Sequence, residues 1–252
     1  MAHPVTAILG LGREAGPAIA RRFHEEGHHV IAADPDKKRI AHAKDALPDD
    51  VILSHSNLDT EMGLKNALTA ALERFERIDN AVILPRVAEP DTLLEFDDDA
   101  FENASIRALR GAALAMRLFA TRMRAQEDIP ASGMDRARQM GTITFVLSIN
   151  ARLGEPGRFT DSVTQGAVLA AMRAGALELA EDGIRANAIV AVRPRAEETE
   201  PWLKQRTPLG RAALADEIAD AALYLSSPQA AIITGATLML DGGRSILSSV
   251  LE

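Results

Sequence analysis

Residues 5–16 read VTAILGLGREAG, an apolar run that passes directly into a turn containing Gly10, Gly12 and Gly16. Glycines between a buried strand and a helix allow a tight turn and a close approach of the backbone to a pyrophosphate at the helix N-terminus. The next apolar run ends at Asp34, which follows Gly12 by 22 residues. A carboxylate at that place can accept hydrogen bonds from the ribose of an adenine nucleotide. Strand, glycine turn, helix, strand and acid, in that order, predict a dinucleotide-binding unit.

A purely structural interpretation of the same residues stays open. The glycines can serve only as a tight turn, and Asp34 can start a turn, Asp34-Pro35-Asp36, into the next helix. Glu14 also opposes a bound diphosphate, because two negative charges in contact repel by about 1 kcal/mol or more unless Arg13 neutralises one of them. If a nucleotide binds, we expect it to be held by Gly10, Gly12, Arg13, Gly16 and Asp34.

The rest of the chain alternates short apolar runs with longer amphipathic ones. We predict seven strands, at 5–9, 29–33, 51–54, 80–84, 142–148, 186–192 and 237–240. Helical periodicity marks 15–27, 36–46, 60–76, 98–126, 160–182 and 214–226, and the polar stretch 127–140 is expected to be a surface loop. Strands that alternate with helices form right-handed crossovers and a parallel sheet covered on both faces. The sequence therefore predicts an α/β fold, with residues 1–252 forming a single Rossmann-type doubly wound domain whose seven-stranded parallel sheet is flanked by helices.

The composition is that of an ordinary globular chain of 252 residues, with 47% hydrophobic and 25% charged residues. The net charge of −8 leaves no basic surface for nucleic acid or anionic lipid. There is no cysteine, which excludes disulfides, thiolate nucleophiles and cysteine-ligated metals. The start lacks a signal-peptide pattern, and the longest uncharged run, 221–240, is interrupted by Pro228 and Gly235. We expect a cytoplasmic protein without nucleic-acid or membrane partners.

Several later blocks are specific in combination and spacing. Arg77-Ile78-Asp79 leads into the predicted fourth strand, and Gly183-Ile184-Arg185-Ala186-Asn187 leads into the sixth. The C-terminal part carries Pro208-Leu209-Gly210-Arg211, Ile233-Thr234-Gly235 and Asp241-Gly242-Gly243. With the glycine turn, these blocks make the chain similar, nearly end to end, to the short-chain dehydrogenase/reductase family. The resemblance implies a Rossmann-type sheet of order 3-2-1-4-5-6-7, a nicotinamide dinucleotide as cofactor, and a homodimer or homotetramer.

The resemblance is weakest at the positions that carry the family's chemistry. In the family, a tyrosine hydroxyl exchanges a proton with the substrate, and a lysine four residues later lowers the pKa of that tyrosine and holds the nicotinamide ribose. The matching positions here are Asp161 and Gln165, whereas the serine position is retained as Ser148. The other changed positions are Glu14 in the glycine turn, Ile83-Leu84-Pro85-Arg86 after the fourth strand, Ala108 for an asparagine, and Ala191-Val192 (or Pro194-Arg195 with three residues inserted) for a Pro-Gly.

No shift of the alignment restores the tyrosine–lysine pair. The only tyrosine is Tyr224, near the C-terminus, and no lysine lies between Lys65 and Lys204. General acid–base help of this kind is worth about 10²–10⁴ in rate. If the carboxylate at position 161 is exposed, it is ionised at neutral pH and cannot donate a proton in place of the tyrosine. Burial, which raises the pKa of a carboxyl group, is the one route by which it could still do so. We therefore expect no ordinary dehydrogenase activity.

Ser148 and Asp161 are expected to face one cleft, and two interpretations of them remain. As a catalytic pair, Asp161 acts as a general base, with Arg152 or Arg158 binding an anionic ligand. As structural residues, Ser148 caps a strand end while Asp161 or Thr160 caps the helix that starts nearby, which is the commoner role. The six histidines all precede residue 56 and lack a metal-ligand spacing, so we expect no metal site.

Three functions are compatible with this pattern. The first, favoured by the shared loss of catalytic and cofactor-holding motifs, is a homologue with a degenerate active site that acts as a partner subunit or binds an unknown small molecule. The second is an atypical NAD(P)-dependent oxidoreductase that uses Ser148 and Asp161. The third is a non-redox lyase or isomerase-type enzyme that uses the same two residues. Any dinucleotide should bind weakly, with NAD(H) preferred over NADP(H), because Asp34 repels a 2′-phosphate.

We also expect a homodimer or homotetramer that buries the helices near 98–126 and 160–182. Small residues at packing positions allow helices to approach closely. The alanines on which this expectation depends are Ala112, Ala115, Ala167, Ala171 and Ala174.

Overall fold

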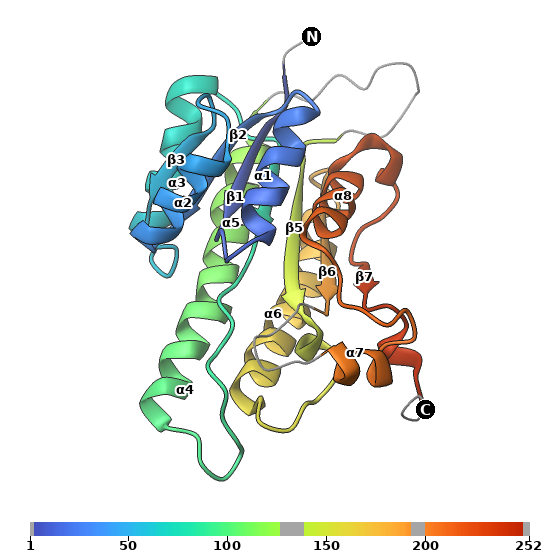
Figure 1. The fold of residues 1–252 in the computed structure, drawn as a ribbon. Coiled ribbons are helices and arrows are strands. Elements are labelled where there is room, and N and C mark those ends of the chain that lie inside the picture. The colour runs from blue at the N-terminus through green and yellow to red at the C-terminus, as the bar shows by residue number, and fades with distance from the viewer. Residues whose placement is uncertain (1–2, 127–138, 193–199, 249–252) are drawn as a thin grey trace.

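The computed structural model describes residues 3–126, 139–192 and 200–248, and its centre is a parallel β-sheet of seven strands (Figure 1). The strands are β1 (Val5–Leu9), β2 (His29–Asp34), β3 (Ile52–His55), β4 (Asn80–Ile83), β5 (Gly141–Ser148), β6 (Ile184–Ala191) and β7 (Thr237–Leu240). They lie in the order β3-β2-β1-β4-β5-β6-β7, and every pairing is parallel. The predicted doubly wound, Rossmann-type sheet and its strand order are confirmed.

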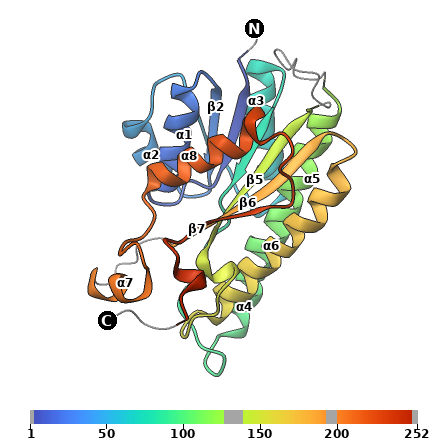
Figure 2. The same ribbon diagram turned by 90° about the vertical axis from the view of Figure 1, so that its right-hand side faces the viewer.

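The two faces of the sheet have separate cores, because successive strand residues point to opposite faces. Helices α1 (Ala15–Glu25), α2 (Lys37–Ala46) and α8 (Ala215–Ser226) cover one face, and α3 (Glu61–Phe75), α5 (Gly111–Arg124) and α6 (Phe159–Leu179) cover the other (Figure 2). In β2, Val30 and Ala32 belong to the same core as Phe23 of α1. The neighbouring Ile31 belongs to the opposite core, with Phe119 of α5. Continuous apolar runs are therefore the pattern that a sheet buried on both faces requires.

The predicted helix at 98–126 is present but irregular. Helix α4 (Asp98–Ser105) passes without a break into a π-helical turn, Ile106–Arg110, which continues into α5. Such turns insert one extra residue into a helix and are frequent at functional sites. Here the turn contains Ala108, which is 2% exposed.

Two further details differ from the sequence expectations. Helix α7 (Glu200–Arg206) was not predicted, and the expected surface loop at 127–140 lies outside the described residues except for its last two positions. Ala112 and Ala115 are 3% and 1% exposed within a single chain, so they pack α5 onto the sheet rather than face a partner. Among the residues described, no helix is both long and apolar enough to cross a bilayer.

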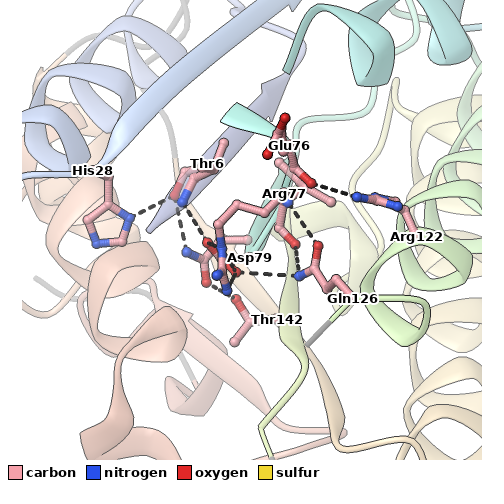
Figure 3. Close-up of polar contacts among 11 residues, drawn as sticks. Thr6, His28, Glu76, Arg77, Asp79, Arg122, Gln126 and Thr142 are labelled. Carbon is pink, nitrogen blue, oxygen red and sulfur yellow. Dashed lines mark hydrogen bonds and ion pairs between the residues drawn. The ribbon is translucent and has the colours of Figure 1, made fainter. Parts of the chain in front are cut away.

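At the amino edge of the sheet, polar side chains from neighbouring strands form a connected network (Figure 3). Thr142 donates to Asn80 Oδ1 at 2.7 Å, and Asn80 Nδ2 donates to Thr6 Oγ1 at 3.1 Å. Thr6 Oγ1 in turn lies 2.9 Å from His28 Nδ1. Burial lowers the pKa of His28 to about 4, so its ring is neutral at pH 7.

Asp79 is the centre of the other half of this network and is 1% exposed. One carboxylate oxygen accepts the backbone N–H of Val5 at 2.7 Å, and Arg77 donates to the carboxylate through Nε and Nη2 at 2.7–3.0 Å. The side chain of Gln126 donates to the Ile78 carbonyl at 2.6 Å and ties the end of α5 to the same place. These groups hold β1, β4 and β5 together.

Candidate functional site

A cavity of about 580 Å³ lies at the carboxyl edge of the sheet, beside the ends of β1, β2, β4, β5 and β6. In doubly wound sheets ligands bind in this crevice, where the strand order reverses, and here β1 and β4 are the neighbours at that reversal. Five of the residues selected from the sequence line the cavity: Gly10, Gly12, Arg13, Asp34 and Ser148. The other two, Gly16 and Asp161, lie behind its wall.

The glycine turn has the backbone that its sequence predicts. Gly10 and Gly12 have φ angles of +92° and +62°, in the left-handed region that favours glycine. A Cβ at Gly10 would lie 2.4 Å from the Leu84 carbonyl oxygen, whereas nothing lies within 4 Å of a Cβ at Gly12. The space beside Gly12 is therefore open to a ligand. Gly16 has a packing role, because a Cβ there would lie 2.3 Å from the Leu11 carbonyl oxygen.

Asp34, at the end of β2, is 1% exposed and connects the glycine turn to the next loop. Its Oδ2 accepts the Leu11 N–H at 2.8 Å, and its Oδ1 accepts the Asp36 N–H at 2.8 Å. Arg39 Nη1 lies 3.6 Å from Oδ2 and partly compensates the charge. Each carboxylate oxygen keeps a second lone pair for a ribose hydroxyl. The turn role and the nucleotide role of Asp34 are thus compatible.

The charges around the cavity differ in sign from those of the whole chain, which carries −8. The cavity wall contains six arginines and four carboxylates: Arg13, Arg39, Arg86, Arg107, Arg158 and Arg244, with Glu14, Asp34, Asp59 and Glu89. Glu14 is exposed and its side chain makes no hydrogen bond to the start of α1. The excess of positive charge, together with the open space at Gly12, fits the pyrophosphate of a dinucleotide.

At the other end of the cavity, Ser148 and Asp161 are in contact. Ser148 is 8% exposed and lines the cavity, whereas Asp161, in the first turn of α6, is 0% exposed. Ser148 Oγ donates to Asp161 Oδ2 at 3.1 Å, and Asn150 Nδ2 donates to the same oxygen at 2.8 Å. The Ala88 N–H donates to Oδ1 at 3.3 Å. Asp161 is therefore buried, and it borders the cavity through two of its hydrogen-bond partners, Ser148 and Ala88.

The prediction that Asp161 or Thr160 caps the helix is wrong, because neither side chain caps α6. Helix α6 begins after Arg158 without a side-chain cap from its own N-terminal residues, and the Ser148 side chain caps no helix. The side chain of Asp161 instead joins the end of β5 to the segment after β4. Its oxygens accept three hydrogen bonds from these neighbours.

Gln165, one turn further along α6, is 1% exposed and also bridges these segments. Its Oε1 accepts the Ser148 N–H at 3.3 Å, and its Nε2 donates to the Arg86 carbonyl at 3.3 Å. The Gln165 amide therefore bridges the end of β5 and the segment after β4 through hydrogen bonds to backbone. Of the two arginines proposed for an anionic ligand, Arg158 lines the cavity and Arg152 does not.

Two hydrogen-bond partners of Asp161 could not be found from the sequence. Ala88 contributes a backbone N–H, which residue identity does not reveal. Asn150 lies two residues after Ser148, and nothing in its spacing distinguishes it from other asparagines. The histidines do not enter the site, and no group of three or more histidine, aspartate or glutamate side chains in the described part of the chain is placed to hold a metal ion.

Comparison with known proteins finds relatives that match this chain over nearly its whole length. A family model described as enoyl-(acyl carrier protein) reductase matches residues 11–245. Galactitol 2-dehydrogenase (L-tagatose-forming) of Cereibacter sphaeroides is 30% identical, over 95% of this chain and 94% of that protein. Meso-2,3-butanediol dehydrogenase of Serratia marcescens is 26% identical, over 96% of this chain and 94% of that protein.

Among solved structures, 3-ketoacyl-(acyl-carrier-protein) reductase from Brucella melitensis, complexed with NADH, is 27% identical and superposes with a TM-score of 0.84. The match covers 97% of this chain and 99% of that chain. The family model and these relatives each extend over nearly the whole sequence. The chain therefore belongs to the short-chain dehydrogenase/reductase family.

Proposed function

We propose that the protein is an NAD(P)-dependent oxidoreductase that oxidises a secondary alcohol, with Ser148 and Asp161 as its proton relay. One observation carries the proposal: Ser148 lines the cavity while its hydroxyl donates to the buried Asp161 carboxylate at 3.1 Å. With Asp161 and Gln165 at the tyrosine and lysine positions, the usual proton donor of the family is absent. A carboxylate behind a serine is a proton acceptor, so the geometry favours oxidation of an alcohol over reduction of a ketone.

Each residue of the relay has a defined task. Ser148 Oγ directs its own hydrogen towards Asp161, which leaves a lone pair for the hydroxyl of an alcohol in the cavity. As that hydroxyl loses its proton, Ser148 takes it and passes its original proton to Asp161 Oδ2. Asn150 and the Ala88 N–H hold the carboxylate in place throughout. The bound nicotinamide supplies the hydride acceptor.

The dinucleotide would be held mainly at its adenosine and pyrophosphate end. Gly12 gives the space, Arg13 and Arg39 supply positive charge, and Asp34 accepts from the ribose. We propose weak binding with NAD(H) preferred, because Asp34 disfavours a 2′-phosphate and Gln165 supplies no cation to the nicotinamide ribose. The names of two relatives, a galactitol and a butanediol dehydrogenase, support an alcohol as substrate, and they do not support the lyase or isomerase alternative.

A second candidate is a binding or partner subunit without catalysis. The complete burial of Asp161 and the use of Gln165 to hold backbone favour it, because both positions then serve the structure alone. In that case the cavity binds a nucleotide or another small anion and no hydride moves.

The two candidates are separated by assaying the oxidation of polyols, diols and simple secondary alcohols with NAD⁺ and NADP⁺. We expect turnover in the wild type and a loss of about 10²-fold or more in Ser148→Ala. Ser162→Ala is the matched control, because the Ser162 hydroxyl donates only to the Arg158 carbonyl, one turn back in the same helix. Binding of NADH without turnover on any alcohol would support the second candidate instead.

We propose, in addition, that the chain forms a homo-oligomer through α6 and the π turn. Of the alanines expected there, Ala174 is exposed on α6. Larger apolar side chains share this outward surface: Val163 and Leu177 on α6, and Ile106 and Leu109 on the π turn, are 37–80% exposed. Sedimentation of the wild type and of Leu177→Glu should show a dimer or tetramer and a smaller species, respectively. A monomeric wild type at micromolar concentration would refute this assembly.

A further inference from the structure

The segment between β4 and α4 is hydrogen-bonded to the start of α6. We call residues 86–91 the strap; Figure 1 shows the segment before α4 running between α4 and α6. The Arg86 carbonyl accepts from Gln165, the Ala88 N–H donates to Asp161, and the Asp91 N–H donates to the Gly157 carbonyl at 3.2 Å. Asp91 and Arg158 also form an isolated parallel β-bridge. The strap therefore contacts both positions at which the family carries its tyrosine and lysine.

Asp91 makes more of these hydrogen bonds than any other residue of the strap. Its Oδ1 accepts the Thr160 N–H at 2.9 Å, its Oδ2 accepts the Thr160 hydroxyl, and its carbonyl accepts the Phe159 N–H at 3.3 Å. The first N–H groups of a helix have no partner within the helix and need an outside acceptor. Since α6 has no cap from its own side chains, Asp91 serves as its cap from 69 residues away in the sequence.

The same strap forms part of the cavity wall. Residues 86–90 all line the cavity, and Asp161 follows the capped Thr160 directly. A shift of the strap would thus move the wall, release the Ala88 N–H from Asp161 Oδ1 and loosen the first turn of α6 together.

We propose that Asp91 is a positioning residue, which caps α6 from the strap and thereby holds the Asp161 carboxylate and one wall of the cavity in place. The effect on catalysis rests on the proposed function. The effect on the strap does not, because it follows from the hydrogen bonds of Asp91 alone.

The variants Asp91→Ala and Asp91→Asn test this directly. Alanine removes both side-chain acceptors, whereas asparagine keeps one oxygen for the Thr160 N–H and should restore much of the cap. Asp97→Ala is a matched control, because Asp97 caps α4 by the same kind of bond, to the Ala100 N–H at 2.8 Å, at the far end of the same segment. Circular dichroism verifies that each variant is folded.

The first measurement is amide hydrogen exchange of peptides covering residues 86–91 and 159–165. We expect exchange to rise about tenfold or more in Asp91→Ala, to stay near wild type in Asp91→Asn, and to be unchanged in Asp97→Ala. Unchanged exchange in Asp91→Ala, or an equal rise in Asp97→Ala, would overturn the proposal. This result does not depend on whether the protein is an enzyme.

The second measurement is the steady-state kinetics of alcohol oxidation. We expect kcat of Asp91→Ala to fall about tenfold or more with a smaller change in KM, because Asp161 loses the Ala88 N–H and is no longer held in place, and we expect Asp91→Asn to restore most of the rate. Faster exchange with unchanged kcat would show that the strap does not position Asp161. An inactive wild type would refute the proposed function and, with it, the catalytic half of this inference, while the exchange result still decides whether Asp91 holds the strap.

Discussion

The two edges of the sheet carry similar polar groups and use them in opposite ways. At the amino edge, Thr6, Asp79, Asn80 and Thr142 are 0–4% exposed and bond to one another and to backbone (Figure 3). At the carboxyl edge, Ser148 bonds to a buried carboxylate in the same way but keeps one side on a cavity. A cluster of buried polar residues therefore marks a site only where one member faces a space that a ligand can enter. Variants at the amino edge should change stability alone, and variants at the carboxyl edge should change binding or rate.

The largest expected effect on stability is that of Asp79→Ala. Removing one partner of a fully buried ion pair costs about 3–5 kcal/mol. Here Asp79 is buried and Arg77 is 24% exposed, so we expect a loss near the lower end of that range, since the Val5 N–H and Arg77 both lose their acceptor. Urea denaturation at pH 7 measures the loss, and Asp216→Ala, which breaks an exposed pair with Arg21, should cost less than about 1 kcal/mol. NADH affinity of the folded Asp79→Ala protein should match that of the wild type. A loss of NADH affinity in folded Asp79→Ala would contradict the claim that the amino edge serves stability alone.

The next effect is the acid sensitivity caused by His28. Its pKa is lowered from 6.5 to about 4 in the folded protein, mainly by burial. Below pH 6.5 the unfolded chain therefore binds more protons than the folded one. The free energy of unfolding thus decreases as the pH is lowered from about 6.5 to about 4. The loss attributable to His28 amounts to up to about 3 kcal/mol.

Denaturation of the wild type and of His28→Gln between pH 8 and pH 4 measures this contribution. The glutamine variant should lose less stability on acidification, whereas His42→Gln, at an exposed position on α2, should follow the wild type. Parallel curves for the wild type and His28→Gln would contradict the assignment.

The smallest expected loss of folding stability is that of Gly12→Ala, which tests the role of the carboxyl edge in binding. A residue with a Cβ in the left-handed region lowers folding stability by about 1–2 kcal/mol. The added methyl group would meet no other atom of the protein within 4 Å. A dinucleotide using that space would be displaced, so we expect NADH affinity to fall about tenfold or more, equivalent to about 1.4 kcal/mol. Gly27→Ala has a similar φ of +83° at the opposite edge and should cost similar stability with no change in affinity. Equal NADH affinity in the two variants would show that the glycine turn holds no pyrophosphate.

The fold could be predicted almost completely from the sequence. Strands buried on both faces must be apolar throughout, so the seven runs and their alternation with helices were visible. The π turn at 106–110 was not, because its residues, IRALR, have ordinary helical character. Helix α7 was missed because it is only seven residues long.

The site could be predicted less completely. Gly10, Gly12 and Asp34 were found because their roles follow from backbone conformation and from position at a strand end. The surroundings of Asp161 were not, since its partners include a backbone N–H from Ala88 and its place depends on a cap from Asp91. Contacts between segments about 70 residues apart leave no periodic pattern in the sequence.

The most direct test of the relay is to measure alcohol oxidation and NADH binding together in Asp161→Asn. The amide preserves the size of the carboxylate but cannot take up the proton from Ser148. We predict that kcat/KM for oxidation falls by about 10²-fold or more, while the Kd for NADH stays within about twofold of wild type, because Asp161 lies outside the nucleotide end of the cavity. An oxidation rate equal to that of the wild type, or a wild type that oxidises no alcohol while binding NADH, would contradict the role of Asp161 as the base.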